Sequence, residues 1–276
     1  MILICLLAAA AVLAGCGDGG GAEGPGVVAT TAVATDIVRH VAGPDVHVET
    51  LLPRGASPHD FGASAKDRAE LDEADLVVAW GAGLEAGLPL DDVDPVELAR
   101  PQDESDPHVW MDPTRIADDL PRIAAALAER DPEGAAGYRR RARSYARRLD
   151  TLDRELRRTI ATIPPRRRTL VTSHDELGHF ADRYGLEVIG TPFGRAPGSE
   201  PNAETVSDLI ARVKREHVRA VFAESTEDPE VVDQIAREAH VEVVDDLLVE
   251  GFGGGVDSYA GMLRFDARRI AKALGR

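Results

Sequence analysis

The 276-residue sequence contains only two cysteines, Cys5 and Cys16, and both lie within its first 16 residues. The rest of the chain can therefore form no internal disulfide, and a metal site in it must use nitrogen and oxygen ligands. Lysine is also scarce, with three residues among 32 basic ones, and the net charge is −16. An acidic chain of this kind is not expected to bind nucleic acid.

Long hydrophobic runs are missing as well. The first 15 residues, MILICLLAAAAVLAG, are uncharged and nearly all apolar, but a membrane-spanning helix needs roughly 20 such residues. The run is typical of a secretory signal peptide that ends in small residues. What remains is a chain with 43% hydrophobic and 29% charged residues, a composition typical of globular proteins.

The end of this run, Leu13-Ala14-Gly15-Cys16, resembles the bacterial lipoprotein signal, in which the cysteine is lipidated and becomes the new N-terminus. We therefore expect a signal peptide over residues 1–15, a lipid anchor on Cys16 and a flexible, Gly-rich tether over residues 16–26. Such a protein would be extracytoplasmic and lipid-anchored to the outer face of the cell membrane. A signal peptide without lipidation is the alternative.

From Val27 onward, short strand-like runs alternate with helical stretches, a pattern typical of parallel sheets covered by helices. Strands are expected at 27–33, 46–52, 75–80, 168–173, 186–190, 219–224 and 241–247. Helices are expected near 34–42, 64–73, 114–129, 175–184, 203–217, 228–239 and 257–274. Ligands of such sheets bind at the carboxyl ends of the strands, so residues that follow a strand are the candidates for function.

One segment, residues 131–163, carries a single apolar stripe that recurs every three or four residues, as on one face of a helix. Asp131 can cap this helix, and Pro164 and Pro165 end it. A helix of about 32 residues spans roughly 48 Å, which is enough to link two lobes. The prediction is an α/β protein with two lobes, each a parallel sheet flanked by helices, joined by one long rigid α-helix. The lobes would cover residues 27–130 and 164–276.

Three of the eight histidines lie in loops or at strand ends. His59 follows the second strand in the loop RGASPHDFGAS, His108 lies between two Asp-Pro steps in ESDPHVWMDP, and His174 follows the strand at 168–173. His179 would lie some 140° around a helix from His174, so the two are poor joint ligands, and we interpret His179 as a packing residue or a neighbour of the site. The others are interpreted as surface or packing residues: His40, His47, His217 and His240.

Acidic residues end two of the later strand-like runs. These are Glu224 and the pair Asp245 and Asp246. Three neutral imidazoles and one carboxylate form a reasonable four-coordinate shell for a divalent transition ion. The residues alone therefore suggest a metal site, although histidines at loop positions have many other roles.

Four segments carry a resemblance to a known family. In chain order they are LLPRGASPHDFGASAKDRAELDEADLVVAWGAGLE, DPHVWMDP, VTSHDELGHFADRYGL and VDDLLVEGFGGGVDSYAGMLRFDARRIAKAL. Together they resemble the solute-binding proteins of ATP-binding-cassette importers for zinc and manganese, over nearly the whole chain from Val27 to Leu274. The resemblance implies two α/β lobes joined by one long rigid helix, in agreement with the helix predicted from the apolar stripe.

The resemblance also implies a set of metal ligands. The family's first three ligands fall on His59, His108 and His174, and the third position is histidine in some members and glutamate in others. The fourth is an acid before the last helix, which the motif VDDLL assigns best to Asp245, with Asp246 one residue away. Glu224 matches a family glutamate at a strand end, which would hold a ligand's second nitrogen.

The function implied is capture of Zn²⁺ or Mn²⁺ and delivery to the permease and ATPase subunits of an importer, by a monomer that is not an enzyme. Zinc is favoured because imidazole-rich shells suit it, whereas oxygen-rich shells suit manganese. Many zinc-specific members carry a His-rich insertion before DPHVW, which this sequence lacks. The alternatives are a zinc-dependent hydrolase, which would need an open ligand position and a general base, and a surface adhesin of the same family.

Overall fold

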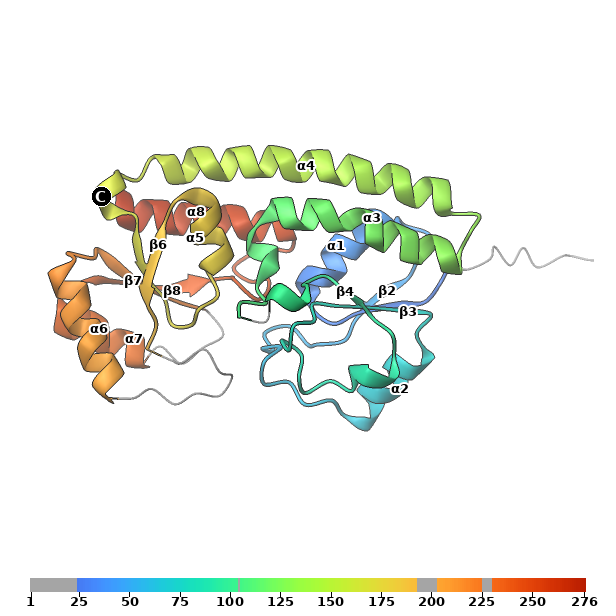
Figure 1. The fold of residues 1–276 in the computed structure, drawn as a ribbon, viewed down its shortest axis with the longest axis horizontal. Helices are drawn as coiled ribbons and strands as arrows, with labels where there is room; N and C mark the ends of the chain where they lie inside the picture. The colour runs from blue at the N-terminus through green and yellow to red at the C-terminus, as the bar shows by residue number, and fades with distance from the viewer. Residues whose placement is uncertain (1–23, 104, 193–202, 225–229) are drawn as a thin grey trace, which may run out of the picture.

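The computed structural model describes residues 24–103, 105–192, 203–224 and 230–276, and these form two α/β lobes side by side (Figure 1). The predicted fold class is therefore confirmed. The proposed signal peptide and Cys16 lie outside the described residues. No helix within the described ranges is long and apolar enough to cross a membrane.

The first lobe is built on a four-stranded parallel sheet in the order β2-β1-β3-β4. Its strands are β1 (Val27–Ala29), β2 (Val48–Thr50), β3 (Leu76–Ala79) and β4 (Val96–Glu97). Its helices are α1 (Ala32–Ala42), α2 (Ala65–Glu73) and α3 (Pro113–Arg130), with short 3₁₀ turns η1 (Leu90–Asp92), η2 (Pro101–Asp103) and η3 (Val109–Met111). The strand β4 was not predicted, since two residues give too short a run for an alternation pattern.

The second lobe contains two parallel strand pairs, β5 (Thr169–Val171) with β6 (Glu187–Gly190) and β7 (Ala220–Glu224) with β8 (Glu242–Leu247). A bridge between Thr172 and Phe222 joins the pairs edge to edge. The helices that follow these strands are α5 (Gly178–Tyr184), α6 (Ala203–Arg215), α7 (Glu230–Ala239) and α8 (Tyr259–Gly275), and η4 (Pro165–Arg167) precedes β5. The pairing of β7 with β8 shifts register between Phe222 and Glu224.

The long helix α4 (Ala135–Ala161) has 27 residues and runs along both lobes (Figure 1). It is shorter than the predicted 131–163 because Asp131 ends α3 instead of starting α4. The Asp131 carboxylate accepts hydrogen bonds from the Gly134 amide at 3.0 Å and the Tyr138 hydroxyl at 2.6 Å, which fixes the turn between the two helices. The predicted apolar stripe is buried as expected: Tyr138, Ala142, Tyr145, Leu149, Leu152, Leu156 and Ile160.

The two lobes share one hydrophobic core, which extends from Val27 to Leu274 and includes the stripe of α4. The last helix, α8, packs along α4 and also contacts α1. Two hydrogen bonds cross the middle of the molecule: the indole of Trp110 donates to the Val249 carbonyl at 2.7 Å, and the Tyr259 hydroxyl donates to the Trp110 carbonyl at 2.6 Å. The lobes are thus tied together beside the strand ends.

Candidate metal centre

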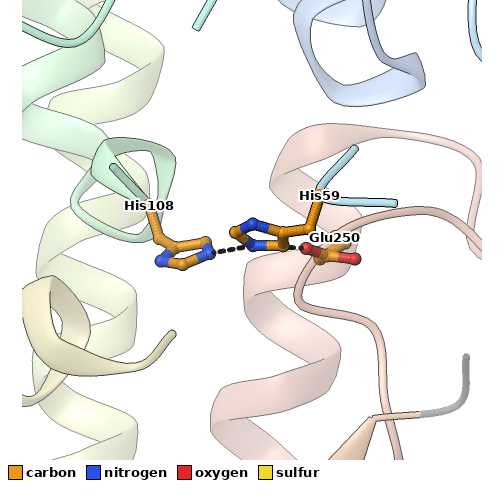
Figure 2. A group of neighbouring side chains, drawn as sticks. All are labelled: His59, His108 and Glu250. Carbon is orange, nitrogen blue, oxygen red and sulfur yellow. Dashed lines mark hydrogen bonds and ion pairs between the residues drawn. The ribbon is translucent and has the colours of Figure 1, made fainter. Parts of the chain in front are cut away.

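Two of the predicted histidines face each other between the lobes. His59 lies in the loop between β2 and α2, and His108 directly precedes η3. Their Nε2 atoms are 3.1 Å apart, and Figure 2 shows the two rings pointing toward one another. His108 is buried, whereas 22% of the His59 side chain remains exposed. The structure therefore brings together two residues that lie 49 positions apart in the sequence.

A carboxylate from the second lobe completes a cluster of three. The Oε1 atom of Glu250, which follows β8, lies 3.4 Å from His59 Nε2, and its side chain is 4% exposed (Figure 2). One possible ligand atom from each of His59, His108 and Glu250 lies within 4.8 Å of the other two. Ligands at about 2.1 Å from a tetrahedral ion are roughly 3.4 Å apart. The two measured separations match that spacing, so one ion fits between these atoms.

His174 lies at the rim of the same cluster. It follows β5, its side chain is 37% exposed, and its Nδ1 is 3.6 Å from Glu176 Oε1. Burial, together with the charges of His108 and His174, lowers the pKa of His59 to about 4. His174 is therefore close enough to interact with the pair, although its ring is not among the three groups that already lie together.

The predicted fourth ligand, Asp245, is not at this site, and neither is Asp246. Asp245 is exposed within β8. Asp246 pairs with Arg269, with 2.6 Å between Asp246 Oδ2 and Arg269 Nη2. The prediction failed because the motif VDDLL was taken as the end of the strand. The buried run continues through Leu248 and Val249, so the first acid after it is Glu250, and the end of that run was the signal that could have found it.

Behind the cluster lies a second group of acids. Glu176, Glu224 and Glu250 each offer a carboxylate oxygen within 4.8 Å of the others, and all three are buried. Burial raises the pKa of Glu176 to about 8, against the lowering effect of its hydrogen bond with Glu224. Burial also raises the pKa of Glu250 well above its usual range, and the charge of Glu224 adds to that rise. Like charges this close cannot all ionise without a cation, so the group favours cation binding.

Glu224, predicted to hold a ligand's second nitrogen, belongs to this group of acids. Among the contacts that the structure describes, it is Glu176 that faces a ring nitrogen, the Nδ1 of His174, and Glu224 bonds to Glu176. Glu176 was missed because sequence reasoning concentrated on His174 itself, two residues earlier in SHDEL.

His108 is oriented by Asp106. The Asp106 carboxylate lies 2.8 Å from His108 Nδ1, and its own pKa is lowered, because the hydrogen bond and charge of His108 outweigh the opposing effect of burial. An ionised carboxylate only accepts, so Nδ1 carries the proton and the Nε2 lone pair points at the site. Trp110 packs edge-on against the ring, with centroids 5.2 Å apart. Asp106 is in turn near His179, whose Nε2 is 2.9 Å from the Asp106 carbonyl oxygen.

This geometry gives a first prediction. Asp106→Ala is expected to weaken metal binding by about 10- to 100-fold, the effect typical of removing the carboxylate behind a ligand histidine. Titration calorimetry with Zn²⁺ measures it. The matched control is Asp118→Ala, because Asp118 is exposed on α3. Equal affinities for the Asp106 variant and the unaltered chain would show that the carboxylate does not orient His108 for binding.

Comparisons with known proteins agree with this arrangement. The family profile described as zinc-uptake complex component A, periplasmic, matches residues 27–273. The chain is 30% identical to the zinc-binding protein TroA of Treponema pallidum, over 91% of this chain and 89% of TroA. It is 27% identical to the manganese-binding lipoprotein MntA of Halalkalibacterium halodurans, over 98% of this chain and 97% of MntA.

Solved structures of related proteins have the same fold. The structure of periplasmic zinc binding protein TroA from Treponema pallidum aligns with a TM-score of 0.83 and 28% identity, covering 92% of this chain and all of that one. A second is the laminin binding protein Lmb of Streptococcus agalactiae, described as bifunctional with adhesin and metal transporting activity. It aligns with a TM-score of 0.81 and 26% identity, over 91% of this chain and all of Lmb.

Proposed function

Because this chain belongs to the family of the periplasmic zinc-uptake complex component A, we propose that it is the solute-binding protein of an ATP-binding-cassette importer for a divalent transition metal. The observation that carries the proposal is the convergence of His59 and His108 from the first lobe with Glu250 from the second. A site made by both lobes binds its ion where the lobes meet. The family consists of metal-binding solute-binding proteins of transport systems and not of enzymes, so the hydrolase alternative is set aside.

The proposed ligands are His59, His108, His174 and Glu250. His59, His108 and Glu250 already lie at ligand spacing. His174, whose side chain is 37% exposed, is proposed to supply the fourth ligand atom. Glu176 and Glu224 stay behind them as hydrogen-bonding partners. Four protein ligands around one ion leave no position for a reacting water, which suits capture better than catalysis.

The direct test is metal analysis of the purified protein followed by titration. We expect one zinc ion per chain. The variant His59→Ala with His108→Ala should bind none, whereas His40→Ala with His240→Ala should bind as the unaltered chain does. A chain that binds zinc equally well without the first pair would contradict the proposed site.

The proposed cargo is zinc rather than manganese. Relatives of this chain are named for zinc, manganese and iron, so their names do not favour one metal over the others. Three imidazoles and one carboxylate favour zinc, and zinc is the tighter binder at almost any such site. Tight binding in solution does not by itself decide which ion is transported. Selectivity between the two metals is therefore tested by replacing one of the proposed ligands.

His174→Glu is therefore expected to lower zinc affinity much more than manganese affinity, because it exchanges a nitrogen ligand for an oxygen. Competition between Zn²⁺ and Mn²⁺ for the same chain measures the ratio. His47→Glu makes the same change of charge on a side chain that is 80% exposed, and should leave the ratio unaltered. If His174→Glu lowers both affinities equally, His174 does not set the selectivity.

We further propose that Cys16 carries a lipid, that the protein works as a monomer at the outer face of the cell membrane, and that its partners are the permease and ATPase subunits of the importer. The sequence Leu13-Ala14-Gly15-Cys16 and the relatives named as lipoproteins support the anchor. Cys16→Ser is expected to release the protein from the membrane fraction into the medium or periplasm. Equal retention of both forms would contradict the lipid anchor.

A further inference from the structure

The solvent face of α4 is a strongly basic surface on an otherwise acidic protein. The helix carries nine arginines and three acidic residues, whereas the whole chain has a net charge of −16. Its first half, residues 135–149, contains six arginines and no acid. Five of the six are exposed: Arg148, and the four considered next, Arg139, Arg140, Arg143 and Arg147.

These four arginines share one side of the helix. Arg139, Arg143 and Arg147 follow one another at steps of four, and Arg140 lies between the first two, so all four fall within about 100° of the helix circumference. The opposite side is buried against the core by Tyr138, Ala142, Tyr145 and Leu149. The four arginines, here called the basic face, therefore point outward together.

The described chain begins beside this surface. Gly24 and Gly26 line a cavity of about 1120 Å³ together with Arg141, Ser144 and Arg148 of α4. Arg39 lines the same cavity, and so do two acids, Asp45 and Asp75. Cys16 is eight residues before Gly24, and a chain of that length spans at most about 28 Å.

We propose that the basic face of α4 binds the anionic lipid surface of the membrane to which the protein is anchored. This inference rests on the lipid anchor of the proposed function. A lipid anchor holds the chain at the bilayer, and a basic patch beside it adds electrostatic attraction to anionic lipids. An anchor within about 28 Å of the cavity keeps the basic face at a bilayer that carries the opposite charge.

The acidity of the rest of the chain does not prevent this contact. Charges are screened beyond about 8 Å at physiological salt. The membrane surface therefore interacts with the residues that touch it and not with the net charge of the protein. The first acid of α4 is Asp150, at the end of the basic half. The helices α3 and α8 lie between α4 and the sheets, so α4 forms an outer side of the molecule (Figure 1).

The test uses the lipidated protein in vesicles. After the signal peptide is removed, Cys16 is the only native cysteine and carries the lipid, so one new thiol can be labelled selectively with a fluorophore. Ser144→Cys puts the label on α4, within the basic half. Lys66→Cys puts it on α2, which lies on the far side of the molecule from α4 (Figure 1). Lipids with a nitroxide on the headgroup quench a label that is close to the membrane.

In vesicles of phosphatidylcholine with phosphatidylglycerol, the label at position 144 should be quenched much more strongly than the label at position 66. The difference should vanish in pure phosphatidylcholine, and at about 0.5 M salt, where the screening length is only about 4 Å. Replacing Arg139, Arg140, Arg143 and Arg147 together by Gln should abolish it, because each arginine at an anionic surface contributes roughly fivefold to the binding equilibrium.

The matched control replaces four exposed cations of the second lobe by Gln, namely Lys214, Arg215, Arg219 and Arg237. The change in net charge is identical, and the quenching difference should persist. This inference alone is overturned if the protein stays on the vesicles but the labels at positions 144 and 66 are quenched equally. It is also overturned if both quadruple variants change the quenching difference to the same extent. A chain that leaves the vesicles altogether overturns the lipid anchor as well.

Discussion

Glu250→Gln is expected to weaken zinc binding by about a hundredfold, whereas Asp245→Asn is expected to leave it unchanged. The carboxylate of Glu250 lies 3.4 Å from His59 Nε2, and Asp245 is exposed on β8. A four-ligand zinc site in a protein binds with roughly 12 kcal/mol, so one ligand of four accounts for about 3 kcal/mol, or a hundredfold. Gln keeps the size of the side chain and removes the charge.

Calorimetric titration of both variants at the same pH decides between the two acids. Asp246→Asn belongs in the series, because Asp246 pairs with Arg269 and its loss should affect stability and not affinity. The assignment of Glu250 is wrong if Asp245→Asn lowers affinity while Glu250→Gln does not. Thermal unfolding of each metal-free variant separates a lost ligand from a damaged fold.

Zinc affinity is expected to fall as the pH is lowered from about 7.5 to about 5.5. A ligand that carries a proton must lose it when the ion binds, which costs tenfold in affinity for each pH unit below its pKa. The source of that proton is not His59, because burial lowers its pKa to about 4 and it is already neutral across this interval. It is Glu250, whose pKa burial raises well above the usual range.

An acid with a raised pKa is protonated over more of the pH range, and the ion must displace that proton to bind. Zinc affinity therefore decreases as the pH falls. Titrations in two buffers of different ionisation enthalpy should show that protons are released when the ion binds. In Glu250→Gln the pH dependence should become shallow. A dependence that is equally steep in that variant would assign the proton to the histidines.

The two-lobe fold was predictable because its signals are local. The apolar stripe of α4 and the alternation of strands and helices follow from spacings of three, four and two residues. The start of α4 was misplaced by a few residues, because Asp131 can end one helix as well as start another, and only its hydrogen bonds with Gly134 and Tyr138 decide between these roles.

The site was only partly predictable. His59 and His108 stand out because each is alone in a stiff loop, and the structure brings their rings together. Glu250 was not among the candidates, because two earlier acids, Asp245 and Asp246, were taken for the same role. The apolar pair Leu248 and Val249 continues the buried run to Glu250, but the shift in the pairing of β7 with β8 next to Glu224 cannot be read from the composition of either strand.

The shared core also sets the order in which this chain can fold. Tyr259, at the start of α8, bonds to the Trp110 carbonyl, and its amide bonds to Asp36 of α1. The first lobe therefore cannot complete its core until residues 259–275 have been synthesised. A chain that ends before residue 259 lacks the helix that closes this core, so the apolar faces of α1 and α4 that α8 covers are left open to water.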